Sequence, residues 1–225
     1  MKPPIKRMTK AEILWLSENL CRAHGHTYLS HYDCLLKENP DHAPFHERIG
    51  FLDIESTGLK ANWDFVLCYC LKLLDGPILG RHLTPREITS YKFDKNLTDE
   101  LIKDIEKFDR VTTYYGSRFD LLFIRTRAEK WDLEFPAYRD LFQTDVYDIA
   151  KSRLLLHSTR LENVCKLLKI PAKEHRLEPD IWQKAQAGHK ESLEFIFTHC
   201  QEDVISLEAV WKRLNRYTIP QKRSI

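Results

Sequence analysis

Two acidic residues at the end of a predicted buried strand could bind a divalent cation. The segment "FLDIES" places Asp53 and Glu55 two residues apart. Alternate residues of a strand share a face, so the two carboxylates point the same way and repel each other unless a cation lies between them. Mg²⁺ prefers such oxygen ligands. An alternative interpretation is a solvated strand end that carries two ordinary surface acids.

Two further acids lie beside apolar segments. Asp120 follows a predicted strand and Gly116, where an apolar helix begins. Asp203 lies on a long predicted helix whose Val204 and Leu207 face a core. Each acid alone could be the polar border of an apolar stripe. The four acids in this order, with these neighbours, favour a metal site.

A second group of metal-ligating residue types lies near the N-terminus. Cys21 and His24 are separated by two residues and followed by a glycine, and His31 and Cys34 repeat the spacing in reverse. Two thiolates and two imidazoles suit a tetrahedral, structural Zn²⁺. Against this, only six residues link the pairs, and His26 competes as a ligand. The alternative is a helix end with buried cysteines and capping histidines.

Composition limits the class of protein. The chain has 225 residues (26.7 kDa), is 43% hydrophobic and 30% charged, and has a net charge of +2 with a pI near 8.2. This is typical of a globular protein with one substantial core. No apolar run has the length of a signal peptide or membrane span, and six scattered cysteines indicate a reducing compartment. We therefore expect a cytoplasmic protein without a membrane partner. Its oligomeric state is not indicated.

The hydrophobic pattern predicts the elements that must position the acids. A Cys/His-rich segment, 1–47, precedes an α/β domain, 48–225. Strands are predicted at 48–54, 64–74, 77–84 and 110–115. Helices are predicted at 98–109 with Thr98 as N-cap, and at 119–130, 145–154, 160–170, 179–188 and 190–217. This order predicts a mixed sheet flanked by helices.

Three segments of this domain resemble a known family. "FLDIESTGL", "YYGSRFDLLF" and "HCQEDV" are similar, in this order, to the motifs of DEDD exonucleases in the ribonuclease H-like superfamily. The YprB-like ribonuclease H domains are the most similar branch, and the resemblance covers about residues 48 to 214. It implies a ribonuclease H-like fold in which Asp53, Glu55, Asp120 and Asp203 bind two Mg²⁺ or Mn²⁺ ions. It also implies 3′–5′ hydrolysis of phosphodiester bonds at a single-stranded end.

The resemblance points to His199 as the residue that activates water. The family carries a Tyr four residues before the last Asp or a His five residues before it, whereas here His199 is four residues before Asp203. Residues i and i+4 share a helix face, and an imidazole is a suitable general base. The register departs from both subclasses. The alternative is a helix-surface histidine beside Cys200.

The resemblance also implies substrate contacts. Thr57, Gly58 and Leu59 resemble the turn that lies against the terminal nucleotide, with Leu59 as a wedge between bases. Tyr115 stands where the family usually has Asn; it could stack on a base or belong to the core. Arg118 would contact the phosphate backbone.

Several interpretations stay open. Other basic residues near the motifs, Arg127 among them, could also track phosphate or could form a solvated helix face. The four acids suit an endonuclease or structure-specific nuclease as well as an exonuclease. A catalytically inactive nucleic-acid-binding module is a further alternative. Nothing in the sequence selects DNA or RNA.

Overall fold

The chain forms two compact units, Met1–Glu47 and Arg48–Ile225. The computed structural model describes residues 8, 10–38, 47–137, 140–171 and 178–217. The smaller unit contains α1 (Lys10–Glu18) and α2 (Tyr32–Glu38), joined by two turns. None of the helices in these ranges combines the length and the apolar character needed to cross a bilayer.

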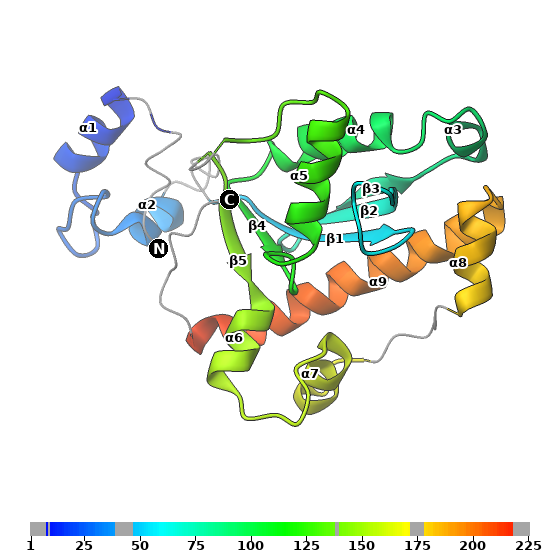
Figure 1. Cartoon of the computed structure of the whole chain (residues 1–225). Coiled ribbons are helices and arrows are strands. Elements are labelled where there is room, and N and C mark those ends of the chain that lie inside the picture. The colour runs from blue at the N-terminus through cyan, green and yellow to red at the C-terminus, as the bar shows by residue number, and fades with distance from the viewer. Residues whose placement is uncertain (1–7, 9, 39–46, 138–139, 172–177, 218–225) are drawn as a thin grey trace. The chain divides into compact units, whose positions relative to one another are not determined.

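A five-stranded mixed sheet is the centre of the larger unit (Figure 1). Its strands are β1 (Ile49–Ser56), β2 (Val66–Leu73), β3 (Ile78–His82), β4 (Arg110–Thr113) and β5 (Phe142–Asp145). The spatial order is β3-β2-β1-β4-β5, with β1 antiparallel to β2 and parallel to β4. The central strand β1 therefore carries the two acids of the first motif.

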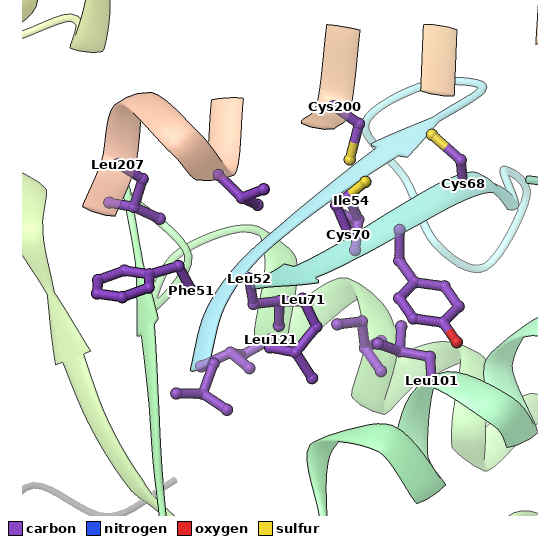
Figure 2. Packing of buried hydrophobic residues seen from close by; sticks show 14 of the residues in the cluster. Phe51, Leu52, Ile54, Cys68, Cys70, Leu71, Leu101, Leu121, Cys200 and Leu207 are labelled. Carbon is purple, nitrogen blue, oxygen red and sulfur yellow. The ribbon is translucent and has the colours of Figure 1, made fainter. Parts of the chain in front are cut away.

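Helices cover both faces of this sheet. They are α3 (Pro85–Thr89), α4 (Lys95–Ile105), α5 (Asp120–Lys130), α6 (Val146–Arg153), α7 (Leu161–Leu168), α8 (Pro179–Gln186) and α9 (Lys190–Leu214). The long α9 lies along one face, and α4 and α5 lie on the other (Figure 1). In Figure 2, Cys200 and Leu207 of α9 lie on one side of the sheet, and Leu101 and Leu121 lie on the other. The predicted mixed sheet flanked by helices is confirmed.

Three elements differ from the sequence prediction. The helix expected to begin after Thr98 begins at Lys95, and Thr98 is completely buried inside it. The edge strand β5 was not predicted, because "FQTD" has no apolar alternation. The short helix α3 was not predicted either, although its N-cap Thr84 and Glu87 form a capping box.

A buried ion pair fixes α5, the helix that begins at the third acid. Arg127 of α5 is 1% exposed, and its guanidinium donates two hydrogen bonds, of 2.8 and 2.6 Å, to the carboxylate of Asp94. The same carboxylate accepts from the backbone of Val66 (2.9 Å) and the indole of Trp131 (2.9 Å), and Arg127 also donates to the carbonyl of Ala61 (2.9 Å). Arg127 is therefore a structural residue, and neither interpretation left open for it, a phosphate contact or a place on a solvated helix face, is correct.

We expect Asp94→Ala to destabilise the protein by about 3 kcal/mol, because it leaves a buried guanidinium without a counter-charge. Asp99→Ala is the matched control: its pair with Lys103 is exposed, with side-chain exposures of 40% and 65%, and such pairs contribute less than about 1 kcal/mol. Urea unfolding of both variants measures the difference. Equal effects would show that the buried pair does not hold α5.

Candidate active site

Strand β1 presents Asp53 and Glu55 on the face that α9 covers. Their strand partners on β2 are Cys70 and Cys68, and the register shifts directly after Glu55. A β-bulge of this kind ends regular pairing and redirects the chain. On the same face Phe51 contacts Trp211 of α9, with ring centroids 5.5 Å apart. Phe51, Asp53 and Glu55 thus share one face of β1, as expected for alternate residues of a strand: the apolar residue comes first and the two acids follow.

Asp120 reaches the same strand from the start of α5. The backbone N–H of Ile54, between the two acids of β1, donates to Asp120 Oδ1 at 3.2 Å. Asp120 is 5% exposed. Burial raises the pKa of this carboxyl to about 7, opposed by its backbone hydrogen bonds and assisted by the negative charges of Asp145 and Asp203. Asp120 is therefore adjacent to β1 and in the electrostatic field of Asp203.

The loop before Asp120 is held by a residue that sequence reasoning missed. Asp145, at the end of β5, accepts hydrogen bonds from the backbone of Tyr115 (2.8 Å) and of Ser117 (3.1 Å) and from the Ser117 hydroxyl (2.5 Å). It also caps α6 through the N–H of Tyr147 (3.1 Å). These bonds stabilise Tyr115 in a left-handed conformation, with φ +69°. The available signal was an Asp at the start of a predicted helix, a residue type preferred at the N-cap.

Helix α9 supplies the last acid and a histidine. His199 Nε2 lies 3.4 Å from Asp203 Oδ2, and the side chains are 13% and 11% exposed. Ligand atoms of Glu55, His199 and Asp203 all lie within 4.8 Å of one another. One residue beyond His199, the Cys200 thiol contacts the backbone oxygen of Asp53 at 3.5 Å. The structure thus brings His199 and acids from the first and third motifs together.

Three buried thiols form the apolar floor beside these acids. Cys68, Cys70 and Cys200 are 0% exposed, and their sulfur atoms cluster between β1, β2 and α9 (Figure 2). Burial raises the pKa of Cys68 to about 11 and the pKa of Cys200 well above its ordinary value. These thiols therefore stay protonated and contribute packing, not nucleophiles.

Replacing Asp120 by Asn should change the pH dependence of stability in protein treated with a chelator. Because the folded pKa of about 7 lies above the unfolded value, this carboxyl favours folding at low pH, and the contribution is lost as pH rises towards 7 and above. The Asn side chain does not titrate and can still accept from Ile54. Between pH 5 and pH 8 the stability of Asp120→Asn relative to wild type should increase by about 3 kcal/mol. Urea unfolding at both pH values tests this; parallel curves would contradict it.

The loop that follows β1 is closed by its own hydrogen bonds. The Thr57 hydroxyl accepts from the backbone of Phe65 (3.1 Å) and contacts Asp64 (3.4 Å). A Cβ at Gly58 would lie 2.5 Å from the Asp64 carboxylate, so a larger residue there would force the Asp64 side chain to move. Leu59 is 77% exposed at the tip of this loop. Thr57 and Gly58 thus shape the loop, and Leu59 faces solvent.

Exposed apolar area on this loop extends beyond Leu59. Trp63 is 83% exposed, a residue that the sequence reasoning missed. Exposed aromatic side chains are the residue type that stacks on bases. The loop that directly follows Glu55 therefore presents one aliphatic and one aromatic side chain to solvent.

An aromatic cleft of about 510 Å³ lies at the carboxyl ends of β4 and β5. Its lining residues are Tyr114, Tyr115, Tyr147, Ser158, Thr159, Arg160 and Leu161. The rings of Tyr115 and Tyr147 meet edge to face at 4.9 Å. The Arg118 guanidinium lies 5.5 Å from the Tyr115 ring and pairs with Asp148 at 2.9 Å. Tyr115 is 45% exposed and is therefore not a core residue.

The oxygen-rich group at the end of β1 is of the kind that hard cations prefer. Asp53, Glu55, Asp120 and Asp203 come from three elements far apart in the sequence. Burial is the main cause of the raised pKa of Asp120, and the negative charge of Asp203 adds to it, a repulsion that a divalent cation would relieve. Their donor atoms suit Mg²⁺ or Mn²⁺.

Comparison with known proteins agrees with this geometry. A family model described as the RNase_H superfamily matches residues 50–215. The chain belongs to the ribonuclease H superfamily. This is a superfamily of nucleases that generally use divalent metals. Its ribonuclease H-like fold is thereby confirmed.

A solved structure shares this fold. It is that of the family B DNA polymerase from the hyperthermophilic archaeon Pyrobaculum calidifontis, at 15% sequence identity and a TM-score of 0.63. The match covers 76% of this ribonuclease H-like chain and 25% of the polymerase, so the similarity is one of fold over about a quarter of the polymerase's length. No curated protein matches the sequence.

Proposed function

We propose that this protein is a metal-dependent nuclease of the DEDD type that removes nucleotides from the 3′ end of a DNA or RNA strand. One observation carries the proposal: acids from β1, α5 and α9 converge at the end of the central strand. The Ile54–Asp120 hydrogen bond and the proximity of Glu55 to Asp203 describe that convergence. Membership of a nuclease superfamily supports nucleic acid as the substrate.

Asp53, Glu55, Asp120 and Asp203 would hold the divalent cations. Bound there, Mg²⁺ or Mn²⁺ supplies charge neutralisation at the phosphate and lowers the pKa of the attacking water. The protein contributes rigid positioning. Asp53 is fixed in the centre of the sheet, and Asp120 is fixed by its bond to β1. In the proposed reaction the protein would act by orienting the reacting groups and by stabilising the charge of the transition state.

His199 is the proposed general base. In the hydrolytic step a water oxygen bonds to phosphorus, the bond from phosphorus to the departing 3′ oxygen breaks, and a proton leaves the water. His199 would accept this proton on whichever ring nitrogen is unprotonated, and the 3.4 Å distance from Nε2 to Asp203 Oδ2 supports a position of the imidazole beside the acids. His199 and Asp203 are four residues apart on α9, so both side chains lie on the same face of the helix.

Exposed side chains near the acids support a single-stranded end as the substrate. Leu59 lies on the loop that directly follows Glu55, and we propose that it contacts the terminal base, with Thr57 and Gly58 shaping the loop. Tyr115 would stack on a further base, and Arg118 would contact phosphate. Tyr115 lines the aromatic cleft, and the Arg118 guanidinium lies 5.5 Å from the Tyr115 ring.

Labelled and circular substrates test the proposed polarity. Single-stranded DNA and RNA, labelled at either the 5′ or the 3′ end, are incubated with the protein and Mn²⁺ or Mg²⁺. A 3′–5′ exonuclease releases mononucleotides from the 3′ label at once and produces a ladder from the 5′ label. Cleavage of a closed circle would replace this proposal with an endonuclease. If the protein cleaves none of these substrates, the remaining alternative is a catalytically inactive nucleic-acid-binding module.

A further inference from the structure

Two thiols and two imidazoles converge in the N-terminal unit, outside the proposed active site. His24 Nδ1 lies 3.7 Å from Cys21 Sγ and 3.3 Å from Cys34 Sγ, and His31 Nδ1 lies 3.3 Å from Cys34 Sγ. All four ligand atoms lie within 4.8 Å of one another. With Zn–S near 2.3 Å and Zn–N near 2.0 Å, a tetrahedral ion gives S···N edges of about 3.5 Å. The observed separations match these edges.

Local backbone geometry brings each pair of ligands together. The first pair lies in a turn closed by the hydrogen bond from Gly25 N to Cys21 O (2.9 Å), and Gly25 has φ +68°. His24 N also donates to Cys21 Sγ at 3.3 Å, a contact that stabilises a metal-bound thiolate. The second pair spans the start of α2, where Cys34 N donates to His31 O at 3.0 Å. The two turns face each other across a short loop.

The competing interpretations fit less well. Cys21 and Cys34 are free thiols, so no disulfide explains their approach. Both are buried, at 2% and 5% exposure, yet their sulfur atoms make three close contacts with two imidazole nitrogens, His24 Nδ1 and His31 Nδ1. His26, the competing ligand, is not among the four residues whose ligand atoms converge. A capping role for the histidines does not require this convergence.

The small unit has a physical need for such a site. Among its described residues the buried apolar cluster is Met8, Leu16, Cys21, Tyr28, Tyr32, Cys34 and Leu35. Two of these seven are the thiols themselves. A segment of fewer than about 50 residues with so small a core usually needs a metal or disulfide for stability.

We propose that Cys21, His24, His31 and Cys34 bind one structural Zn²⁺ that stabilises the fold of the N-terminal unit. Two thiolates and two imidazoles suit Zn²⁺, in contrast to the oxygen donors of the carboxylate site. Four protein ligands leave no open position, so this ion has no catalytic role. The site is independent of the proposed nuclease activity.

Metal analysis of the full-length protein, purified without chelators, tests this proposal. We expect about one zinc per chain in wild type and in His26→Asn, and less than a tenth of that in Cys34→Ser. His26→Asn is the matched control, since it removes a neighbouring imidazole that is outside the group. Wild-type protein that contains no zinc would overturn the proposal. A folded Cys34→Ser variant that still contains about one zinc per chain would overturn it as well.

Cobalt substitution keeps the test valid if Cys34→Ser fails to fold. Wild-type protein loaded with Co²⁺ should show the visible absorption of a tetrahedral ion together with thiolate-to-metal charge transfer. Asp53→Asn should show the same spectrum, because the carboxylate site is not involved. Absence of the thiolate bands in wild type would overturn the proposal, whatever the nuclease assays give.

Discussion

Asp53→Asn is expected to lower kcat for hydrolysis of a single-stranded oligonucleotide by about a thousand-fold or more, roughly 4 kcal/mol of transition-state stabilisation. Asn is close to Asp in size but removes one negative charge from the carboxylate group at the end of β1. The rest of Asp53 is held by strand pairing and by the contact of its backbone oxygen with Cys200, neither of which needs the carboxylate. The loss should therefore be of function and not of fold.

The measurement is the initial rate on 3′-labelled substrate with Mn²⁺, with folding checked by circular dichroism. Asp99→Asn is the control, an exposed acid on α4 that should leave the rate unchanged. A second readout separates binding from chemistry. Ligand at a hundred times its Kd stabilises a protein by about 2.7 kcal/mol, so Mn²⁺ should stabilise wild type much more than Asp53→Asn. Retention of a tenth or more of the wild-type rate would contradict the role of Asp53.

The elements that carry the acids of the candidate site could be predicted from the sequence because the neighbours of these acids are informative. Asp53 follows an uninterrupted apolar run, and such a run in a central strand is buried on both faces. Asp203 lies on a 25-residue helix whose apolar stripe is long enough to be read without a partner. In each case the local pattern and the tertiary environment agree, so the sequence alone leads to the correct element.

Residues whose role depends on a distant partner could not be found in this way. Arg127 reads as one more basic residue near a motif, and only the fold shows Asp94 beside it, 33 positions away. Asp145 lies at the end of a strand too short to be recognised, yet it holds the loop that carries Tyr115. Trp63 is exposed in a loop, where no periodicity exists to indicate a role. The contacts of Arg127 and Asp145 join residues far apart in the sequence, and a local sequence pattern does not reveal them.

His199→Ala is expected to lower kcat by about a hundred- to ten-thousand-fold, the usual contribution of a general base. The side chain is 13% exposed and lies 3.4 Å from Asp203, so its removal opens a small space without exposing a core. His189→Ala is the matched control: it is at the N-cap of the same helix, and its ring contacts Ser192 and Glu191, near α9's first turn. This control should keep the wild-type rate.

The stabilisation by Mn²⁺ decides how His199 acts. Its ring nitrogen lies within 4.8 Å of ligand atoms of Glu55 and Asp203, so the same geometry would also suit a metal ligand. A general base can be removed without loss of metal binding, so His199→Ala should keep the full stabilisation by Mn²⁺ while its kcat falls. Loss of both would make His199 a ligand. An unchanged kcat would show that His199 has no catalytic role and only pairs with Asp203 on α9. The attacking water would then have to be activated by the acids alone.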